Sequence, residues 1–342
     1  MKQASSHAAI LGGGVIGLAL ARELAAHNWR VTVVDPQPPA MEASWAAAGM
    51  LAPDSEKHPD RHFRALQAAG RDGYPDYVAK LEKETGRRVG FRTDGLLVAT
   101  PKGSVKEALR EPELVWQPAV FFPHEYSVDN RLLTAALVAS CRKHGVEFVR
   151  ASAVRVDRSG ETLHAVLESG TVLPADAVIN AAGCWAGKIV AQNGHHHVPL
   201  DIRPLKGQIA AVRAEGWKLR YIVRNDHVYL VPRDDNRIIV GATMEEAGYD
   251  KSVEPDVIRN LLQRGAQLVP KIRNAPLVES WAGLRPATRT GLPLIGPTKI
   301  PGYYVAVGHL RNGILLAPLT AQLLGQVIRG GKTADLLKPF AP

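Results

Sequence analysis

Near its N-terminus the chain passes from a short apolar run into a glycine-rich turn, and this feature constrains the fold most strongly. The run is residues 8–11, and the turn, residues 12–17, reads GGGVIG. A helix-like stretch follows to about His27, and a second apolar run, residues 31–34, ends on Asp35. These parts form a strand–turn–helix–strand unit with an acidic residue after the second strand. The pattern predicts a site for the ADP half of a cofactor.

The residues of this unit have separate tasks. Gly12 makes the tight turn, Gly14 lets the backbone approach a pyrophosphate, and Gly17 lets the helix sit close to the strand. The helix N-terminus would then face the phosphates with free N–H groups and the positive end of its dipole. Asp35 could accept hydrogen bonds from a ribose. The alternative is a glycine-rich turn that binds no ligand.

Length and composition indicate a soluble protein of two domains. The chain has 342 residues, of which 46% are hydrophobic and 22% charged, and both values are ordinary for soluble proteins. The two cysteines, Cys141 and Cys184, lack CxxC spacing, which favours buried free thiols and a cytoplasmic location over a disulfide scaffold. No window holds about twenty uninterrupted apolar residues, so we expect no membrane span.

Two other features could suggest different partners. The net charge of +9 could attract nucleic acid, but the basic residues are scattered and few aromatic residues lie among them. We therefore expect no nucleic-acid partner. The run His195, His196 and His197 could suggest a metal site, but adjacent side chains converge poorly on one ion. We expect a solvated loop and no bound metal.

The order of the expected elements predicts an α/β fold. A Rossmann-type cofactor domain would be joined to a second, mostly antiparallel α+β substrate domain. We expect the cofactor domain to be discontinuous, over residues 1–85, 129–200 and 282–342, and the substrate domain to comprise residues 86–128 and 201–281. Helices are expected over residues 61–81, 130–144, 255–268 and 313–328, with Pro318 as a kink, and from Trp185. Strands are expected over residues 91–93, 96–99, 146–149, 153–156, 163–167, 171–173, 177–180, 207–212, 227–231, 237–241 and 303–307.

Polar residues in apolar surroundings mark the chemistry. Burying the charged guanidinium of Arg285 in such surroundings costs free energy unless an anion pairs with it. A carboxylate matches its planar guanidinium, and an internal salt bridge is the alternative. Tyr229 and His227 would share one face of a strand and point into a pocket, unless both are satisfied core residues. Arg311 precedes a helix whose first N–H groups, from Asn312, Gly313 and Ile314, could stabilise negative charge on an aromatic cofactor. Otherwise this segment is an ordinary helix cap.

Five segments together resemble a known family. They are GGGVIG (12–17), ASWAAAGML (43–51), NAAGCWA (180–186), WAGLRPATRTGLPLIGP (281–297) and GHLRNGILLAP (308–318). They resemble the flavin-dependent glycine oxidases of thiamin biosynthesis, in the D-amino-acid oxidase superfamily. The resemblance extends from about residue 8 to about residue 328, and it implies FAD rather than NAD as the cofactor.

The resemblance implies site residues position by position. The ADP half would be held by Val15, Ile16, Asp35 and Pro36, with Val154 at the adenine. The pyrophosphate and the flavin would be lined by Ala43, Ser44, Ala48, Gly49 and Met50, and Gly183 belongs to the same site. The loop and helix start under the flavin pyrimidine ring would be His309, Leu310, Arg311, Asn312, Gly313, Ile314 and Leu315.

For the substrate, the resemblance implies that Arg285 clamps the carboxylate, with Tyr229, Arg311 and His227 in the same pocket. The implied reaction is oxidation of glycine, sarcosine or D-alanine by hydride transfer to flavin N5, with oxygen reduced to hydrogen peroxide. Ala287 stands where the family often has glycine, and Leu310 where it often has phenylalanine, so the substrate preference stays open.

Three alternative functions stay open. They are a D-amino-acid dehydrogenase that uses a quinone or another acceptor, a tRNA-modifying flavin oxidase and a flavin-binding module without catalysis. A homo-oligomer is compatible with the sequence, which does not decide the oligomeric state.

Overall fold

The central sheet of the molecule has six strands and carries the glycine-rich turn at the end of its first strand. In this computed structural model, which describes residues 6–100, 111–115, 119–160, 162–193 and 196–342, all the strands of that sheet except β19 are parallel. The order is β19 (Leu294–Pro297), β20 (Tyr303–Val307), β11 (Ala177–Asn180), β1 (His7–Leu11), β2 (Arg30–Val34) and β7 (Glu147–Val149).

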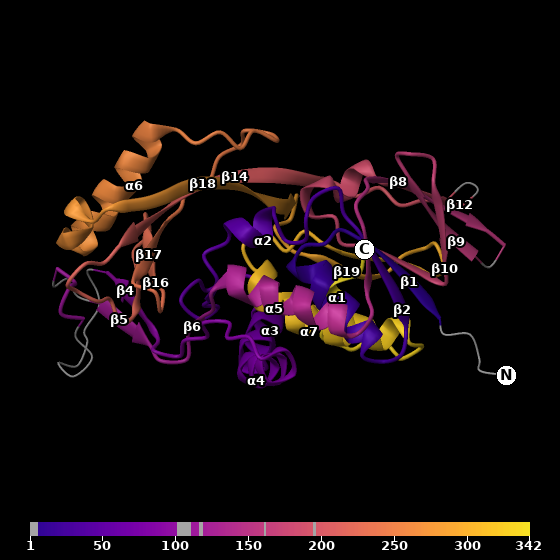
Figure 1. Ribbon diagram of the computed structural model, residues 1–342, viewed down its shortest axis with the longest axis horizontal. Helices are drawn as coiled ribbons and strands as arrows, with labels where there is room; N and C mark the ends of the chain where they lie inside the picture. Colours follow the sequence, from indigo (N-terminus) through magenta and orange to yellow (C-terminus); the bar gives the residue numbers. More distant parts are fainter. Residues whose placement is uncertain (1–5, 101–110, 116–118, 161, 194–195) are drawn as a thin grey trace.

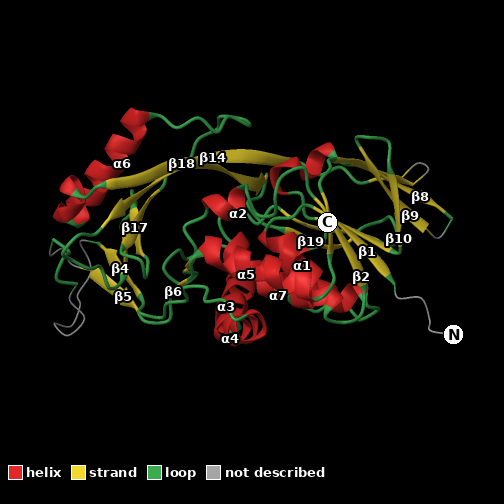
Figure 2. Cartoon of the chain, viewed as in Figure 1, coloured by secondary structure: helices red, strands yellow, loops and turns green. Residues whose placement is uncertain are grey.

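Strand β1 is buried on both of its faces. Ala8 and Ile10 pack in one hydrophobic core, with helices α1 (Val15–Ala25), α5 (Asn130–Lys143) and α7 (Gly313–Ile328). Ala9 and Leu11 pack in another core, with a five-stranded sheet in the order β10 (Val172–Ala175), β9 (Thr162–Leu167), β8 (Ala153–Ser159), β12 (Val190–Asn193) and β13 (His196–His197). The central sheet is therefore covered by helices on one side and by a second sheet on the other (Figure 2).

A seven-stranded, mostly antiparallel sheet forms the other part of the molecule. Its order is β18 (Leu277–Thr288), β14 (Ile202–Arg213), β17 (Arg237–Gly241), β16 (Tyr229–Pro232), β15 (Ile222–Arg224), β4 (Leu96–Ala99) and β5 (Ala119–Phe122). Helix α6 (Pro255–Leu268) packs against it. The long pair β14 and β18 runs from α6 across the top of the molecule in Figure 1, and so connects this sheet with the cofactor side.

The predicted α/β fold class is confirmed, and several elements match closely. The structure has α5, α6, α7 and β20 within one residue of the predicted bounds, and Pro318 lies inside α7. Cys141 and Cys184 are buried free thiols, as predicted.

Some local predictions are wrong, for identifiable reasons. The helix predicted over residues 61–81 is two helices, α3 (Arg61–Asp72) and α4 (Tyr74–Thr85), which meet at Gly73. Residues 91–93 form only an isolated bridge, between Arg92 and Ser127. The segment from Trp185 belongs to a short 3-10 helix, η2 (Gly183–Lys188). The strand predicted over residues 146–149 begins one residue later, as β7, and it is partly exposed because it lies at the edge of its sheet.

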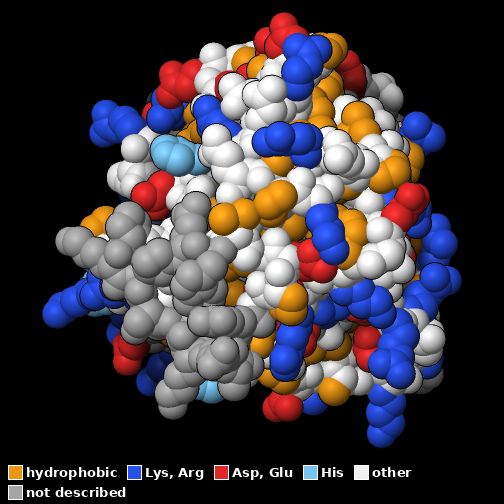
Figure 3. All heavy atoms as spheres, turned by 90° about the vertical axis from the view of Figure 1, so that its left-hand side faces the viewer, with side chains coloured by type: hydrophobic (Ala, Val, Ile, Leu, Met, Phe, Trp, Pro, Cys, Tyr) orange, Lys and Arg blue, Asp and Glu red, His pale blue; other side chains and the backbone are white. Residues whose placement is uncertain are grey.

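On the face of the molecule seen in Figure 3, the positive charge is dispersed. Figure 3 shows Lys and Arg side chains at many separate places on one end of the molecule, with Asp and Glu side chains among them. Within the described ranges, none of the helices is long and apolar enough to cross a membrane. The loop predicted for the three adjacent histidines is wrong for His196 and His197, which form β13 and pair with β12, and His195 lies outside the described residues.

Candidate active site

A cavity of 630 Å³ lies where the carboxyl ends of β1, β2 and β11 meet the long strands β14 and β18. This size is within the range of small-molecule and cofactor sites. All the predicted site residues line the cavity except Gly17 and Leu315. Those that line it are Gly12, Gly14, Val15, Ile16, Asp35, Pro36, Ala43, Ser44, Ala48, Gly49, Met50, Val154, Gly183, His227, Tyr229, Arg285, His309, Leu310, Arg311, Asn312, Gly313 and Ile314.

The glycine-rich turn leaves no room for side chains. Gly12 has a φ of 110°, and a Cβ there would lie 2.4 Å from the carbonyl oxygen of Ala181. A Cβ on Gly17 would lie 1.9 Å from the carbonyl oxygen of Gly12. Gly17 therefore contributes through packing and not by lining the cavity, because its lack of a side chain lets α1 pack against the turn.

Two side chains hold this turn in shape. Asp35 accepts hydrogen bonds from the backbone N–H groups of Gly13 (2.7 Å) and Gln37 (2.8 Å). The Ser44 hydroxyl accepts one from the Val15 N–H (2.8 Å). The expectation of free N–H groups at the start of α1 is therefore wrong for Val15, because a side chain from α2 (Ala43–Ala46) already takes that donor.

The small-residue segment after α2 is fixed by residues that sequence reasoning missed. Gly49 has a φ of 68°, and a Cβ there would meet the Val128 carbonyl oxygen at 2.0 Å. Arg233 donates from Nη2 to the Ala48 carbonyl (2.7 Å), and Asn130 donates to the carbonyls of Ser44 and Trp45 (both 2.8 Å). Burial lowers the pKa of Arg233 to about 10.

The loop before α7 lies against strand β18. The Leu310 N–H donates to the Pro286 carbonyl (3.0 Å), and Leu310 itself adopts a positive φ of 48°. His309 is buried, with Nε2 3.3 Å from the Thr320 hydroxyl, and burial lowers its pKa to about 3. The imidazole is therefore neutral at physiological pH. This loop places the start of α7 at the cavity wall.

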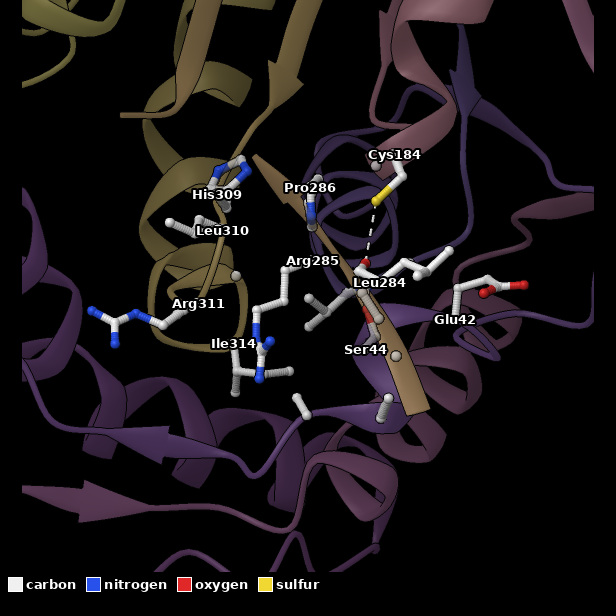
Figure 4. A pocket seen from close by; sticks show the side chains of 18 of the residues that line it. Glu42, Ser44, Cys184, Leu284, Arg285, Pro286, His309, Leu310, Arg311 and Ile314 are labelled. Carbon is white, nitrogen blue, oxygen red and sulfur yellow. Dashed lines mark hydrogen bonds between the residues drawn. The ribbon is translucent and has the colours of Figure 1, made fainter. Parts of the chain in front are cut away.

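Arg285 points from β18 into the cavity, and a glycine makes room for it (Figure 4). A Cβ on Gly207, in the neighbouring strand β14, would lie 2.3 Å from Arg285 Nη1. Nη1 donates to the Thr243 carbonyl (3.1 Å) and, more weakly, to the Lys206 carbonyl (3.4 Å). Burial lowers the pKa of Arg285, which is the effect expected of a guanidinium taken out of water.

Tyr229 reaches the same end of the cavity from β16. A Cβ on Gly241, in β17, would lie 2.4 Å from its phenol oxygen, so this ring too depends on a glycine in the neighbouring strand. Burial raises the pKa of Tyr229, which keeps the phenol protonated and able to donate.

The prediction that His227 shares a strand with Tyr229 is wrong. His227 is exposed in the turn before β16, because the Asn225 side chain accepts the backbone N–H groups of His227 and Val228 and bends the chain there. His227 still lines the cavity, from that turn.

Arg311 lines the cavity but has a different environment from Arg285. Its guanidinium points away from that of Arg285 in Figure 4, and Nη2 lies 3.1 Å from Glu56 Oε2. Glu56 also lies 3.7 Å from Arg224 Nη1. Glu56 and Arg224 carry no motif that the sequence analysis could use. The other cavity-lining residues missed include Gln37, Glu42, Ser152, Glu168, Trp185, Lys188, Thr243 and Met244.

The residues present fit a flavin–adenine dinucleotide. One part of the lining is made of backbone and small residues that any added Cβ would disturb, as at Gly12 and Gly49. The lining continues without a break to Arg285. Cys184 also lines the cavity, but its thiol donates to the Leu284 carbonyl (3.2 Å), and burial raises its pKa to about 12. Cys184 is therefore a packed neutral thiol.

Comparisons with known proteins agree with this geometry. The model of the DAO family, described as FAD dependent oxidoreductase, matches residues 7–327. The glycine oxidase of Geobacillus kaustophilus is 34% identical, over 97% of this chain and 95% of that protein. A crystal structure of glycine oxidase from Geobacillus kaustophilus has a TM-score of 0.90 at 31% identity and covers 98% of both chains.

A longer relative has the same degree of identity. The bifunctional protein ThiO/ThiG of Trichormus variabilis is 34% identical over 97% of this chain, which spans 54% of that protein. The chain thus spans about half the length of the bifunctional relatives it matches. The family match over most of the chain, the full-length likeness to glycine oxidases and the cavity geometry lead to one conclusion: the chain belongs to the DAO family of FAD-dependent oxidoreductases, as a glycine oxidase-like enzyme whose cofactor is FAD.

Proposed function

We propose that this enzyme oxidises glycine and other small amino acids, such as sarcosine and D-alanine, with oxygen as the electron acceptor. The observation that carries the proposal is the pair Arg285 and Tyr229, which face one end of the cofactor cavity from strands β18 and β16 of one sheet. The likeness to proteins named glycine oxidase supports it. The use of the product in thiamin biosynthesis is part of the same proposal.

In this proposal Arg285 binds the substrate carboxylate. Its planar guanidinium can pair with both oxygens, and its partly buried position strengthens the pairing because little water competes. The Tyr229 phenol, kept protonated by burial, donates a further hydrogen bond. Fixing the carboxylate at this end holds the rest of a small amino acid toward the remainder of the cavity, so that positioning does most of the work.

The chemistry that FAD supplies when bound is acceptance of a hydride from the substrate α-carbon, followed by reoxidation with oxygen to give hydrogen peroxide. The chain contributes the N-terminal end of α7, residues 312–314, whose partial positive charge favours negative charge on a reduced cofactor. The other predicted cofactor residues are proposed to hold it as the resemblance implies. Gly17 and Leu315 would act through packing, because they do not line the cavity.

We also propose the division into a cofactor domain (1–85, 129–200 and 282–342) and a substrate domain (86–128 and 201–281). The separate sheets support it: the six-stranded sheet and the seven-stranded sheet share no strand. Strand β18 extends from residue 277 to residue 288, so the boundary at residue 282 falls within one strand. Arg285 would thus lie where the two domains join.

Spectroscopy of the purified protein tests the proposal. The protein should be yellow and should release FAD on denaturation. Anaerobic titration with glycine, sarcosine and D-alanine should bleach the flavin absorbance, whereas L-amino acids and bulky D-amino acids should do so poorly. Admission of air should restore the colour and produce hydrogen peroxide.

Each result has a distinct meaning. Bleaching without peroxide formation in air would favour a dehydrogenase with another acceptor. A clear preference for a large D-amino acid over glycine would overturn the substrate assignment. A protein that binds NAD and no flavin would overturn the whole proposal.

A further inference from the structure

A carboxylate lies among the arginines of the cavity. Glu56 Oε2 is 3.1 Å from Arg311 Nη2, and Glu56 Oε1 is 3.7 Å from Arg224 Nη1. Glu56 lines the cavity, and its side chain is only 16% exposed. Burial has the largest effect on the pKa of the Tyr229 phenol and raises it. The negative charge of Glu56 raises this pKa further, so Glu56 lies near the phenol. Glu56 therefore belongs to the substrate end of the cavity.

The segment that carries Glu56 is firmly anchored. The N–H and the hydroxyl of Ser55 both donate to Glu125, at 2.8 Å and 2.7 Å. Glu125 is completely buried, so this pair of hydrogen bonds is protected from water. Asp54, the residue before Ser55, forms an ion pair with Arg71 of α3. The two residues that precede Glu56 are thus both anchored.

The position of Glu56 determines which arginine is available. The guanidinium of Arg311 already faces a carboxylate. Among the described residues, that of Arg285 forms no ion pair with a carboxylate, and its partners are two backbone carbonyls and the Tyr229 phenol. A substrate with one carboxylate can pair with Arg285 and leave the Glu56 ion pairs intact. A substrate with a second carboxylate would have to displace Glu56 from Arg311 or stand beside its negative charge, and both are unfavourable.

We propose that Glu56 is a specificity-determining residue that restricts the active site to amino acids with a single carboxylate and excludes amino dicarboxylates. The inference rests on the proposed oxidation of small amino acids. Loss of the Glu56 charge would leave Arg311 and Arg224 free to bind a second acidic group.

The sharpest test compares two substrates that differ by one carboxylate. Iminodiacetate is sarcosine with a carboxylate added to its N-methyl carbon. Anaerobic flavin reduction by both compounds should be measured in the wild type, in Glu56→Gln and in Glu56→Asp. We expect Glu56→Gln to raise the ratio of kcat/KM for iminodiacetate to that for sarcosine by about tenfold or more, mainly through KM. Glu56→Asp keeps the charge and should stay closer to the wild-type ratio.

A matched control separates this effect from a general change of charge. Glu42 also lines the cavity, but its partner is Lys251, at 3.0 Å, and it lies on the far side of Arg285 from Arg311 in Figure 4. Glu42→Gln removes the same charge and should keep the wild-type ratio. A binding readout complements the kinetics: malonate should gain affinity relative to acetate in Glu56→Gln, as measured by perturbation of the flavin spectrum.

The outcomes separate the inference from the function on which it rests. If neither sarcosine nor glycine bleaches the wild-type flavin, the proposed function fails. The role of Glu56 is overturned, and the function stands, if sarcosine is oxidised but Glu56→Gln changes neither the iminodiacetate-to-sarcosine ratio of kcat/KM nor the affinity for malonate relative to acetate. The same holds if Glu42→Gln changes these two ratios as much as Glu56→Gln does.

Discussion

The two ends of the cavity are built in different ways. At the cofactor end, the wall consists of backbone and small residues such as Gly12, Ala48 and Gly49, and its shape depends on close approaches of main chain to main chain. At the end proposed to bind the substrate, called the substrate end below, long side chains such as Arg285 and Tyr229 occupy space that glycines on neighbouring strands leave open. A substitution at the first end therefore has to move backbone, whereas one at the second end displaces only a side chain.

The largest effect should follow from an added methyl group at the cofactor end. In Gly17→Ala the new Cβ would lie 1.9 Å from the Gly12 carbonyl oxygen, so the turn itself must shift. We expect the purified protein to lose most of its FAD, with a free energy of unfolding lower by about 1 to 3 kcal/mol. Flavin absorbance per mole of protein and denaturant titration measure both effects.

The control is Gly73→Ala, where the Cβ would be 3.5 Å from its nearest neighbour. This variant should keep its FAD. Normal FAD content in Gly17→Ala would contradict a cofactor end made of rigid backbone.

At the substrate end, Arg285→Lys should act on the substrate alone. Lysine keeps the charge but loses the planar fork that pairs with both carboxylate oxygens. We expect kcat/KM for glycine to fall roughly 100-fold, the scale of one lost charge-assisted hydrogen bond of about 2 to 3 kcal/mol, with FAD content near normal. Steady-state kinetics with flavin quantification provide the measurement. Arg311→Lys, in which the changed arginine faces Glu56, should lose less activity toward glycine.

Gly207→Ala tests the space rather than the side chain. The added Cβ would overlap Arg285 Nη1 at 2.3 Å, and the guanidinium can swing aside because it is the end of a flexible chain. We expect a roughly 20-fold rise in KM for glycine, since small displacements of a binding group are costly. FAD content and melting temperature should match those of Gly73→Ala. Loss of FAD instead would mean that the two ends are not independent.

The smallest effect should come from Tyr229→Phe, which removes one hydroxyl and leaves the ring. A hydrogen bond to a charged carboxylate contributes about 1.5 kcal/mol at the low end of its range, so we expect a roughly tenfold rise in KM for glycine. The pKa of Tyr229 is raised by burial, so its phenol stays protonated through the mildly alkaline range. KM should therefore depend on pH in the same way in the wild type and in Tyr229→Phe between about pH 8 and pH 9.5. A pH dependence of KM that is present in the wild type and absent in Tyr229→Phe would count against the donor role.

The same contrast explains what the sequence could predict. The cofactor end is encoded locally: Gly12, Gly14 and Asp35 lie in one strand–turn–helix–strand unit, and their spacing carries the information. The space for Arg285 comes from Gly207, which is 78 residues away and becomes its neighbour only through strand pairing. Glu56 meets Arg311 across an even larger separation. Such contacts follow from tertiary structure and leave no periodic trace in one sequence.

Local mispredictions have the same origin. The apolar spacing of residues 61–81 is helical throughout, and nothing in that periodicity marks the separation into two helices at Gly73. His227 alternates correctly with Tyr229, but the Asn225 side chain accepts its N–H, and the strand begins only at Tyr229. Side-chain to backbone hydrogen bonds of this kind compete with strand pairing and are difficult to infer from alternation alone.

The burial of β1 on both faces has a consequence for strand register. A strand with one polar face has its register set by alternation, because a shift of one residue would bury the wrong face. β1 has no polar face, so a shift of one residue would not bury polar side chains, and alternation does not set its register. His7, at its start, supplies a substitute: its N–H donates to Asp176 (2.7 Å), and its imidazole Nε2 lies 2.9 Å from the Thr32 hydroxyl on β2. A slip of one residue would move Gly12 by about 3.3 Å along the strand. These polar contacts at the far end of β1 thus fix the position of the turn at the cavity.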